Sequence, residues 1–141
     1  MIYLSISDVV ETHKMTVRVS GGGSEGILNT AKFESVLQHI QNDDYYPTLE
    51  EKLNHLVFCA NKFHCFEDGN KRIAISIGAK FLLNNGYVFI VPRFIREMEN
   101  ISYHLAAGKI AKDLLLDIIT SILYEPEFPE ELKLRILNSI Q

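Results

Sequence analysis

The sequence is poor in several features that would place the protein in a special structural class. It has two cysteines, Cys59 and Cys65, in 141 residues, and its first residues lack the basic, apolar and small-residue blocks of a signal peptide. These features argue against a disulfide framework and predict a reduced, cytoplasmic protein. No apolar run approaches the roughly 20 residues that a membrane-spanning helix needs, so we expect no membrane partner.

Basic residues are too few to indicate a general affinity for nucleic acid. The chain has 14 Lys and Arg against 18 Asp and Glu, a formal net charge of -4, and no long basic run. We therefore expect no direct nucleic-acid partner. With 47% hydrophobic residues, the chain can bury a substantial core. Because no internal repeat, low-complexity tract or linker divides it, we predict a single domain over residues 1–141.

Most of the chain has the apolar spacing of amphipathic helices. The expected helices lie at about residues 5–13, 29–40, 48–64, 70–85, 94–108 and 110–125 and after residue 129. Two stretches differ from this pattern. Residues 16–19, TVRV, alternate and precede GGGSEG, which predicts a short strand or hairpin leading into a glycine-rich loop. Residues 87–91, YVFIV, predict a short extended connector before Pro92.

The densest group of polar side chains is HCFEDGNKRIA at residues 64–74. It follows one predicted helix, and the next helix is expected to start near Asn70. The first turn of a helix presents free backbone N–H groups and the positive end of the helix dipole, which attract anions. Gly69 lets the backbone approach an anion closely, and Lys71 and Arg72 add positive charge. These residues predict a phosphate-binding site.

Two further side chains give this segment catalytic potential. Asp68 offers a hard carboxylate oxygen beside the phosphate site, which is the ligand type by which proteins recruit Mg²⁺. His64 carries an imidazole, the side chain best suited to take a proton from an incoming hydroxyl near neutral pH. Phe66, between them, is expected to point into the core. The segment therefore predicts a general base, a metal ligand and a phosphate site.

The spacing His-x-Phe-x-Asp-Gly-Asn-Lys-Arg resembles the signature of the Fic/Doc family, in the variant with Lys before Arg that is typical of Doc toxins. The resemblance covers about residues 2–124. GGGSEGILNTAKFESVLQHI is similar to the glycine-rich flap and following helix of Doc-like chains, and FLLNNGY resembles a helix end of the family. It implies an all-α Fic fold, a helical bundle with a short β-hairpin flap.

The resemblance also implies a nucleotide-dependent transferase that modifies a protein hydroxyl, with ATP as co-substrate and Mg²⁺ as cofactor. By position, His64 would be the base and Asp68 the Mg²⁺ ligand. The phosphate contacts would come from Gly69, Asn70, Lys71 and Arg72. Doc-like members are similar in being toxins that phosphorylate elongation factor Tu and that are paired with a small antitoxin. A protein substrate and an antitoxin are therefore the expected partners.

Three departures from the family pattern bear on the reaction. Cys65 stands where adenylylating relatives usually have Pro, which changes little because Doc-like chains vary there. Ile75 replaces a second Arg, and Lys71 replaces a Gly, of adenylylating relatives, and both changes favour transfer of phosphate over AMP. No Ser/Thr-x-x-x-Glu-Gly/Asn inhibitory signature occurs. Inhibition is therefore expected from a separate antitoxin.

Other interpretations of these residues remain open. The reaction could be AMP transfer to a Ser, Thr or Tyr hydroxyl. His64 could cap helix carbonyls and residues 68–70 could form a turn and an N-cap, in a catalytically silent binding module. The side-chain types of a structural zinc site also occur, on His55, Cys59, His64 and Cys65. The glycine-rich stretch could be an idle loop or a strand edge that pairs with an extended target.

Overall fold

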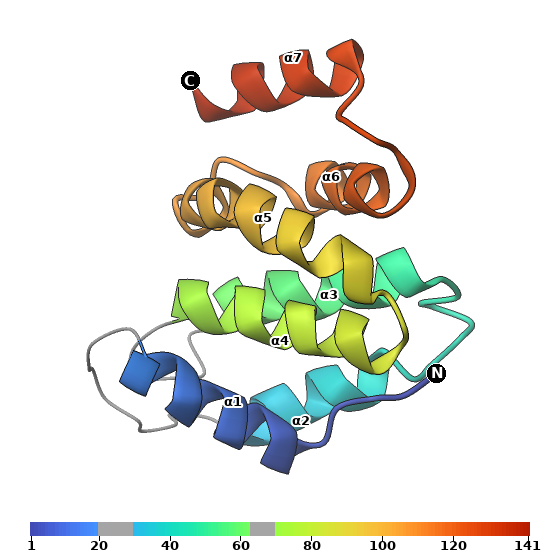
Figure 1. Ribbon diagram of the computed structural model, residues 1–141, viewed down its shortest axis with the longest axis vertical. Coiled ribbons are helices and arrows are strands. Elements are labelled where there is room, and N and C mark those ends of the chain that lie inside the picture. The colour runs from blue at the N-terminus through green and yellow to red at the C-terminus, as the bar shows by residue number, and fades with distance from the viewer. Residues whose placement is uncertain (20–29, 63–69) are drawn as a thin grey trace.

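The computed structural model describes residues 1–19, 30–62 and 70–141, and every regular element in these ranges is a helix. The elements are α1 (Ile6–Val19), α2 (Thr30–His39), α3 (Leu49–Lys62), α4 (Asn70–Asn84), the 3-10 helix η1 (Val88–Ile90), α5 (Val91–Ala106), α6 (Lys112–Tyr124) and α7 (Glu130–Ile140). Figure 1 shows them in layers, with α1 and α2 at the bottom, then α3 and α4, then α5 and α6, and α7 at the top. The expected all-α class is confirmed for the described residues.

Helix α3 is the centre of the bundle. It packs against α2, α4, α5 and α6, and Leu53, Leu56 and Val57 on it are fully buried. Its start is capped by Thr48, whose hydroxyl accepts the backbone N–H of Glu51 at 3.2 Å and donates to the Glu51 carboxylate at 3.0 Å. The helix that precedes the motif therefore has a capped start, and its central residues are buried.

Helix α4 lies between α3 and α5, and its glycine permits the close crossing. A Cβ atom at Gly78 would lie 2.7 Å from Phe94 Cζ of α5 and 3.1 Å from Val57 Cγ2 of α3. At the other end, Gly86 follows the helix with φ +88°, the left-handed conformation in which a glycine commonly ends a helix. The path of α4 is thus set by one close approach and one turn.

The predicted strand at residues 16–19 is wrong. These residues are the last part of α1, in which Val9, His13 and Val17 are buried at four-residue spacing. The alternation in the sequence is overridden because the helix buries this face. No β-hairpin flap is seen in the part of the chain that the structure describes, and residues 20–29 lie outside it.

The predicted extended connector at residues 87–91 is also wrong. The segment forms η1 and the first residue of α5, with the backbone N–H of Ile90 donating to the Tyr87 carbonyl at 3.3 Å. Pro92 suits the start of α5 because its fixed φ is helical and its missing N–H would have no partner there. The chain therefore turns tightly from α4 into α5.

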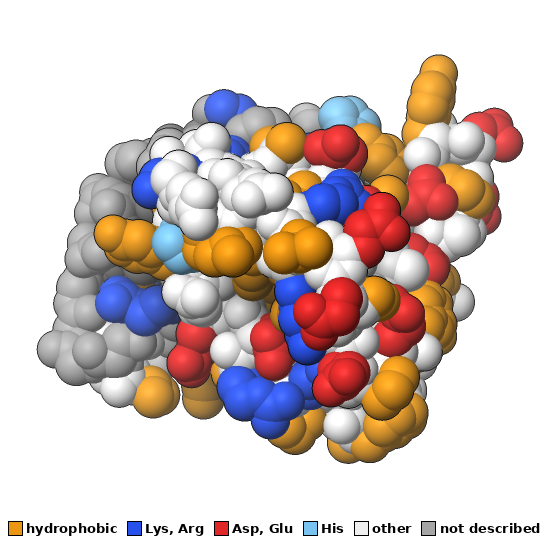
Figure 2. All heavy atoms as spheres, turned by 90° about the horizontal axis from the view of Figure 1, so that it is seen from above, with side chains coloured by type: hydrophobic (Ala, Val, Ile, Leu, Met, Phe, Trp, Pro, Cys, Tyr) orange, Lys and Arg blue, Asp and Glu red, His pale blue; other side chains and the backbone are white. Residues whose placement is uncertain are grey.

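Helix α7 lies at one end of the molecule, against α6 (Figure 1). It buries Leu132, and Arg135 on it forms an ion pair with Asp117 of α6 at 2.7 Å. Seen from above, apolar side chains and charges of both signs are interspersed over the visible face (Figure 2). Within residues 1–19, 30–62 and 70–141, no helix has the length and apolarity to cross a membrane.

Candidate functional site

The start of α4 is the described part of the predicted phosphate site. Asn70 is the first residue of the helix, and the two side chains after it, Lys71 and Arg72, are exposed. Ile73 and Ala74, which follow, are fully buried. Because burial of these two residues fixes the rotation of the helix, both cations of the first turn face the solvent.

The charged side chains of the described first turn of α4 are all positive. The described first turn of α4 contains no acidic residue that would neutralise Lys71 and Arg72 within the turn. A helix start also contributes the positive end of the helix dipole and first-turn N–H groups that have no partner within the helix. This combination suits an anion such as a phosphate group.

A cavity of about 660 Å³ adjoins Arg72 and is bounded by α1, α4 and α5. From α4 it is lined by Arg72, Ile75, Ser76 and Lys80, which share one face because they are spaced three to four residues apart. The Thr16 hydroxyl of α1 donates to Ser76 Oγ at 3.1 Å and joins the two helices at this wall. The helical spacing from Arg72 to Lys80 is visible in the sequence and could have indicated this face.

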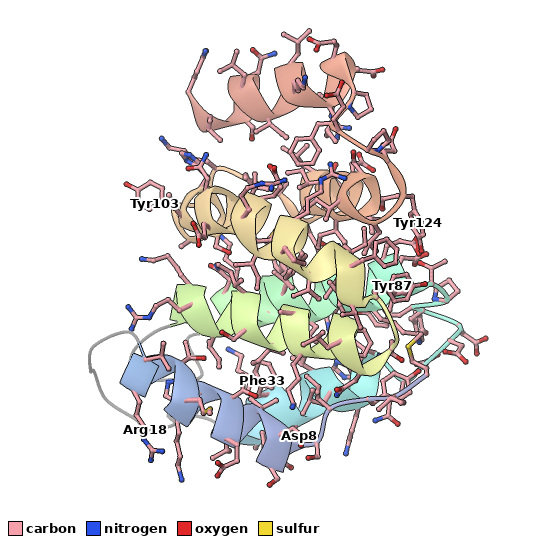
Figure 3. The ribbon with its side chains drawn as sticks, in the orientation of Figure 1. Asp8, Arg18, Phe33, Tyr87, Tyr103 and Tyr124 are labelled. Carbon is pink, nitrogen blue, oxygen red and sulfur yellow. The ribbon has the colours of Figure 1, made fainter. Side chains whose placement is uncertain are left out.

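Helix α1 supplies a negative wall of the same cavity, with Asp8 among its residues. Figure 3 shows Asp8 and Arg18 at opposite ends of α1. The backbone N–H of Ser5 donates to Asp8 Oδ2 at 2.9 Å, and the backbone N–H of Asp8 donates to Ser5 Oγ at 3.1 Å. The hydrogen bonds from Ser5 hold the pKa of Asp8 below its usual value. The cavity is therefore bordered by the cations Arg72 and Lys80 from α4 and by three carboxylates, those of Asp8 and Glu11 from α1 and of Glu99 from α5.

The structure describes only some of the predicted site residues. Outside the described residues lie His64, Cys65, Phe66, Asp68 and Gly69. Asn70 is placed as the start of α4, while Lys71 and Arg72 are described in full and lie together on one exposed turn. The assembly of all six candidate residues into one site stays a prediction.

The alternative zinc interpretation concerns His55 and Cys59 of α3. The Cys59 sulfur lies 3.7 Å from each ring nitrogen of His55. The other two candidate ligands, His64 and Cys65, are not among the described residues. Within the ranges that are described, no three His, Cys, Asp or Glu side chains are grouped so as to hold a metal ion. His55 instead contacts Lys112 Nζ through Nδ1 at 2.7 Å, a partner 57 residues away that sequence spacing does not indicate.

Comparison with models of protein families identifies the family of this chain. The model of the Fic/DOC family matches residues 3–82, more than half of the 141-residue chain. The matched range contains α1 to α3, most of α4 and the whole motif segment at residues 64–74. No curated protein matches the chain. The family match and the described start of α4 therefore concern the same part of the molecule.

Proposed function

The chain belongs to the Fic/DOC family, whose members are typically transferases that act on proteins, and we propose that it transfers the γ-phosphoryl group of ATP to a protein hydroxyl. The observation that carries this proposal is the start of α4, where Lys71 and Arg72 are exposed in a described first turn without an acidic residue. Positive charge and free N–H groups at one helix end favour binding of the nucleotide phosphates.

In the proposed reaction, the Arg72 guanidinium and the backbone N–H groups of Gly69 and Asn70 hold the phosphate oxygens. His64 accepts the proton of the target hydroxyl, whose oxygen forms the new bond to the γ-phosphorus. The bond from the γ-phosphorus to the β–γ bridging oxygen breaks, and ADP leaves with that electron pair. Catalysis then depends mainly on position and charge.

Asp68 suits a Mg²⁺ ion by the chemistry of its side chain, because a carboxylate oxygen beside phosphates is a ligand that Mg²⁺ prefers. When bound, Mg²⁺ supplies positive charge that neutralises the nucleotide phosphates. The described first turn of α4 has no acidic residue, and we assign the ion to a carboxylate of the segment before the helix. Asp68 is the residue there that matches the family motif.

Phosphate, rather than AMP, is the group that we expect to be transferred. In adenylylating relatives a Gly at the position of Lys71 leaves the helix start open to the α- and β-phosphates. The exposed Lys71 adds bulk and charge at this turn and favours a reversed nucleotide with the γ-phosphate toward His64. Ile75, which lines the cavity beside Arg72, stands in place of a second Arg and points the same way.

The test is to incubate the purified protein with a cell lysate and ATP labelled in the γ- or the α-phosphate. We expect label from γ-labelled ATP on a protein band, no label from α-labelled ATP, and a phosphate-sized mass increase of the modified target. Transfer of the α-label would show AMP transfer and contradict the phosphate assignment. Absence of transfer from either nucleotide, with a correctly folded protein, would favour a silent binding module.

We further propose that the protein is the toxin of a toxin–antitoxin pair and that its target is a translation factor similar to elongation factor Tu. The missing inhibitory signature supports the need for a separate inhibitor. Purified elongation factor Tu in the same labelling assay tests the target directly. Expression of the protein alone should arrest growth, and co-expression of its antitoxin should restore it. Normal growth at a high level of unmodified protein would count against the toxin role.

A further inference from the structure

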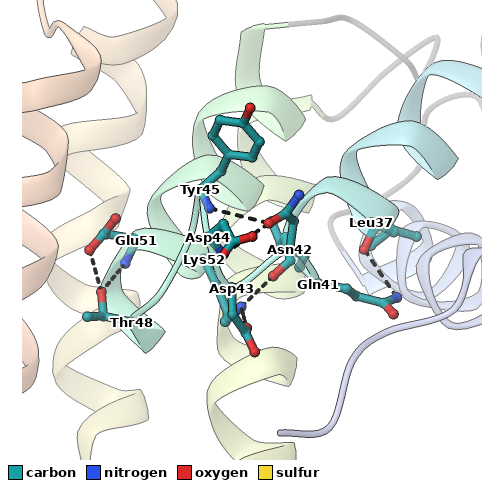
Figure 4. Close-up of polar contacts among 10 residues, drawn as sticks. Leu37, Gln41, Asn42, Asp43, Asp44, Tyr45, Thr48, Glu51 and Lys52 are labelled. Atoms are coloured by element: carbon teal, nitrogen blue, oxygen red, sulfur yellow. Dashed lines mark hydrogen bonds and ion pairs between the residues drawn. The ribbon is translucent and has the colours of Figure 1, made fainter.

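The connection between α2 and α3 is held in a fixed shape by side chains (Figure 4). The Asn42 side-chain oxygen accepts the backbone N–H of Asp44 at 2.9 Å and of Tyr45 at 3.4 Å. Lys52, only 2% exposed, donates from Nζ to the Ile40 carbonyl and to Asp43 Oδ1, both at 2.7 Å. These bonds fix the backbone that leads to Tyr45. Tyr45 itself is 77% exposed and projects from this connection.

A hollow of about 360 Å³ lies beside this tyrosine and shares no lining residue with the cavity beside Arg72. Its volume is at the lower end of the range of small-ligand pockets, about 300–1,000 Å³. Three elements contribute the side chains on which the argument depends. These are Tyr45 and Tyr46 of the connection, Glu51 and Asn54 of α3, and Lys112 and Asp113 of α6.

The charge at this hollow is negative in effect, although it has one cation. The Lys112 ammonium donates to His55 Nδ1 at 2.7 Å and lies 5.7 Å from the ring centres of both Tyr46 and Phe58. Burial, followed by the charges of Lys112 and His39, lowers the pKa of His55 to about 4, so its ring is neutral and can accept this bond. The carboxylates of Glu51 and Asp113 outnumber this single ammonium group, so the side chains of the hollow carry a net negative charge.

A buried acceptor at the same hollow has no donor. Asn54 is 4% exposed, and its Nδ2 donates to the Lys112 carbonyl at 3.2 Å. Its Oδ1 is buried and has no hydrogen-bond partner among the described residues. A ligand in the hollow would contact Asn54 as part of its wall.

We propose that this hollow receives an arginine side chain from a partner protein, independently of the transferase function. A guanidinium is planar, carries five N–H donors and stacks on aromatic rings, which fits Tyr45 and the carboxylates of Glu51 and Asp113. A lysine ammonium is more strongly hydrated and cannot stack in the same way. Phosphate or an acidic peptide is disfavoured because the two carboxylates would repel it.

The probe is a short peptide, acetyl-Gly-Gly-Arg-Gly-Gly-amide, titrated into the ¹⁵N-labelled full chain and followed by NMR. We expect saturable shifts at the backbone N–H of Tyr45 and at the side-chain amide of Asn54. The same peptide with citrulline, which has the shape of arginine but no charge, should bind at least about tenfold more weakly. Raising the salt concentration should weaken the arginine peptide because ion pairs at the surface are screened.

Matched variants locate the binding. Tyr45→Ala and Glu51→Gln should each weaken the arginine peptide by about two- to fivefold, the usual range for one partly exposed contact. Tyr103→Ala, at another tyrosine that is 62% exposed, and Glu127→Gln, at another exposed acid, should leave the affinity unchanged. Equal binding of the citrulline peptide, shifts confined to the cavity beside Arg72, or no saturable shift would each overturn the proposal.

Discussion

Arg72 is the single side chain that connects the described parts of the candidate site. It is exposed on the first turn of α4 and lines the cavity between α1, α4 and α5. Arg72→Ala should lower phosphoryl transfer about 10- to 100-fold, because a hydrogen bond to a charged group contributes about 1.5–3 kcal/mol. The loss is measured as the rate of label transfer from γ-labelled ATP.

The control for this substitution is Arg96→Ala, at an arginine of α5 whose side chain is 70% exposed. Arg96→Ala should keep the parent rate of transfer. The free energy of unfolding of both variants should lie within about 0.5 kcal/mol of the parent value, because surface substitutions rarely cost more. Equal rates for Arg72→Ala and the parent would remove Arg72 from the proposed phosphate site.

His64 is the residue on which the proposed proton transfer depends. His64→Ala should slow transfer by about 10²–10⁴-fold, the usual contribution of a general base, while nucleotide affinity stays nearly the same. Single-turnover labelling measures the rate, and equilibrium binding of ATP measures the affinity. His39→Ala, at an exposed histidine of α2, is the control and should have no effect on either. A His64→Ala protein that works at the parent rate would exclude the base assignment.

Local spacing explains which residues could be recognised from the sequence. The motif lies within residues 64–74, so its pattern is visible without any knowledge of the fold. Lys52 was not recognisable, because a lysine is expected in solvent and its partners, Ile40 and Asp43, lie on a separate connection. Lys112 was missed for the same reason, since it meets His55 only after α3 and α6 have packed together.

Elements were predictable where the apolar pattern is long. The seven α-helices of the described residues correspond to the expected helices, because a periodic face repeated over ten or more residues has few alternatives. The failures are the short stretches at residues 16–19 and 87–91, whose few residues fit a strand as well as a helix. Tertiary packing decided the first stretch, as the burial of Val17 on α1 shows, whereas η1 in the second buries none of its three residues.

The close crossing of α3, α4 and α5 gives a prediction for Gly78. Gly78→Ala gains about 1 kcal/mol of helix propensity, but it places a Cβ 2.7 Å from the Phe94 ring, which is fully buried. Overpacking of this kind costs about 1–3 kcal/mol, so we expect a net loss of stability of about 1 kcal/mol in urea unfolding.

A second substitution tests the reason for that loss. Phe94→Leu removes the far edge of the ring, so Gly78→Ala should cost less in the Phe94→Leu background than in the parent. An increase in the free energy of unfolding on Gly78→Ala alone would show that helix propensity outweighs the crowding and would contradict this account of the crossing.

At the scale of the whole molecule, polar side chains of α3 form hydrogen bonds with other elements of the bundle. His55 contacts Tyr46 of the α2–α3 connection at 3.3 Å and Lys112 of α6 at 2.7 Å. Asn61, further along the same helix, donates to the Ser102 carbonyl of α5 at 3.3 Å. Because these bonds form only in the assembled bundle, a change of charge at one of them acts on the stability of the whole fold.

Acid stability should therefore depend on His55. Burial lowers its folded pKa from 6.5 to about 4, so below pH 6.5 the unfolded chain binds a proton that the folded chain does not bind. The contribution to stability is complete above the unfolded pKa and is lost as the pH falls toward about 4.

His55→Gln keeps an acceptor for Lys112 but cannot titrate, so its free energy of unfolding should fall less steeply over this interval. Urea unfolding at a series of pH values measures the difference between His55→Gln and the parent. An NMR titration of the His55 ring with a midpoint near the unfolded value, or an unchanged slope in His55→Gln, would show that this histidine is not held neutral by the fold.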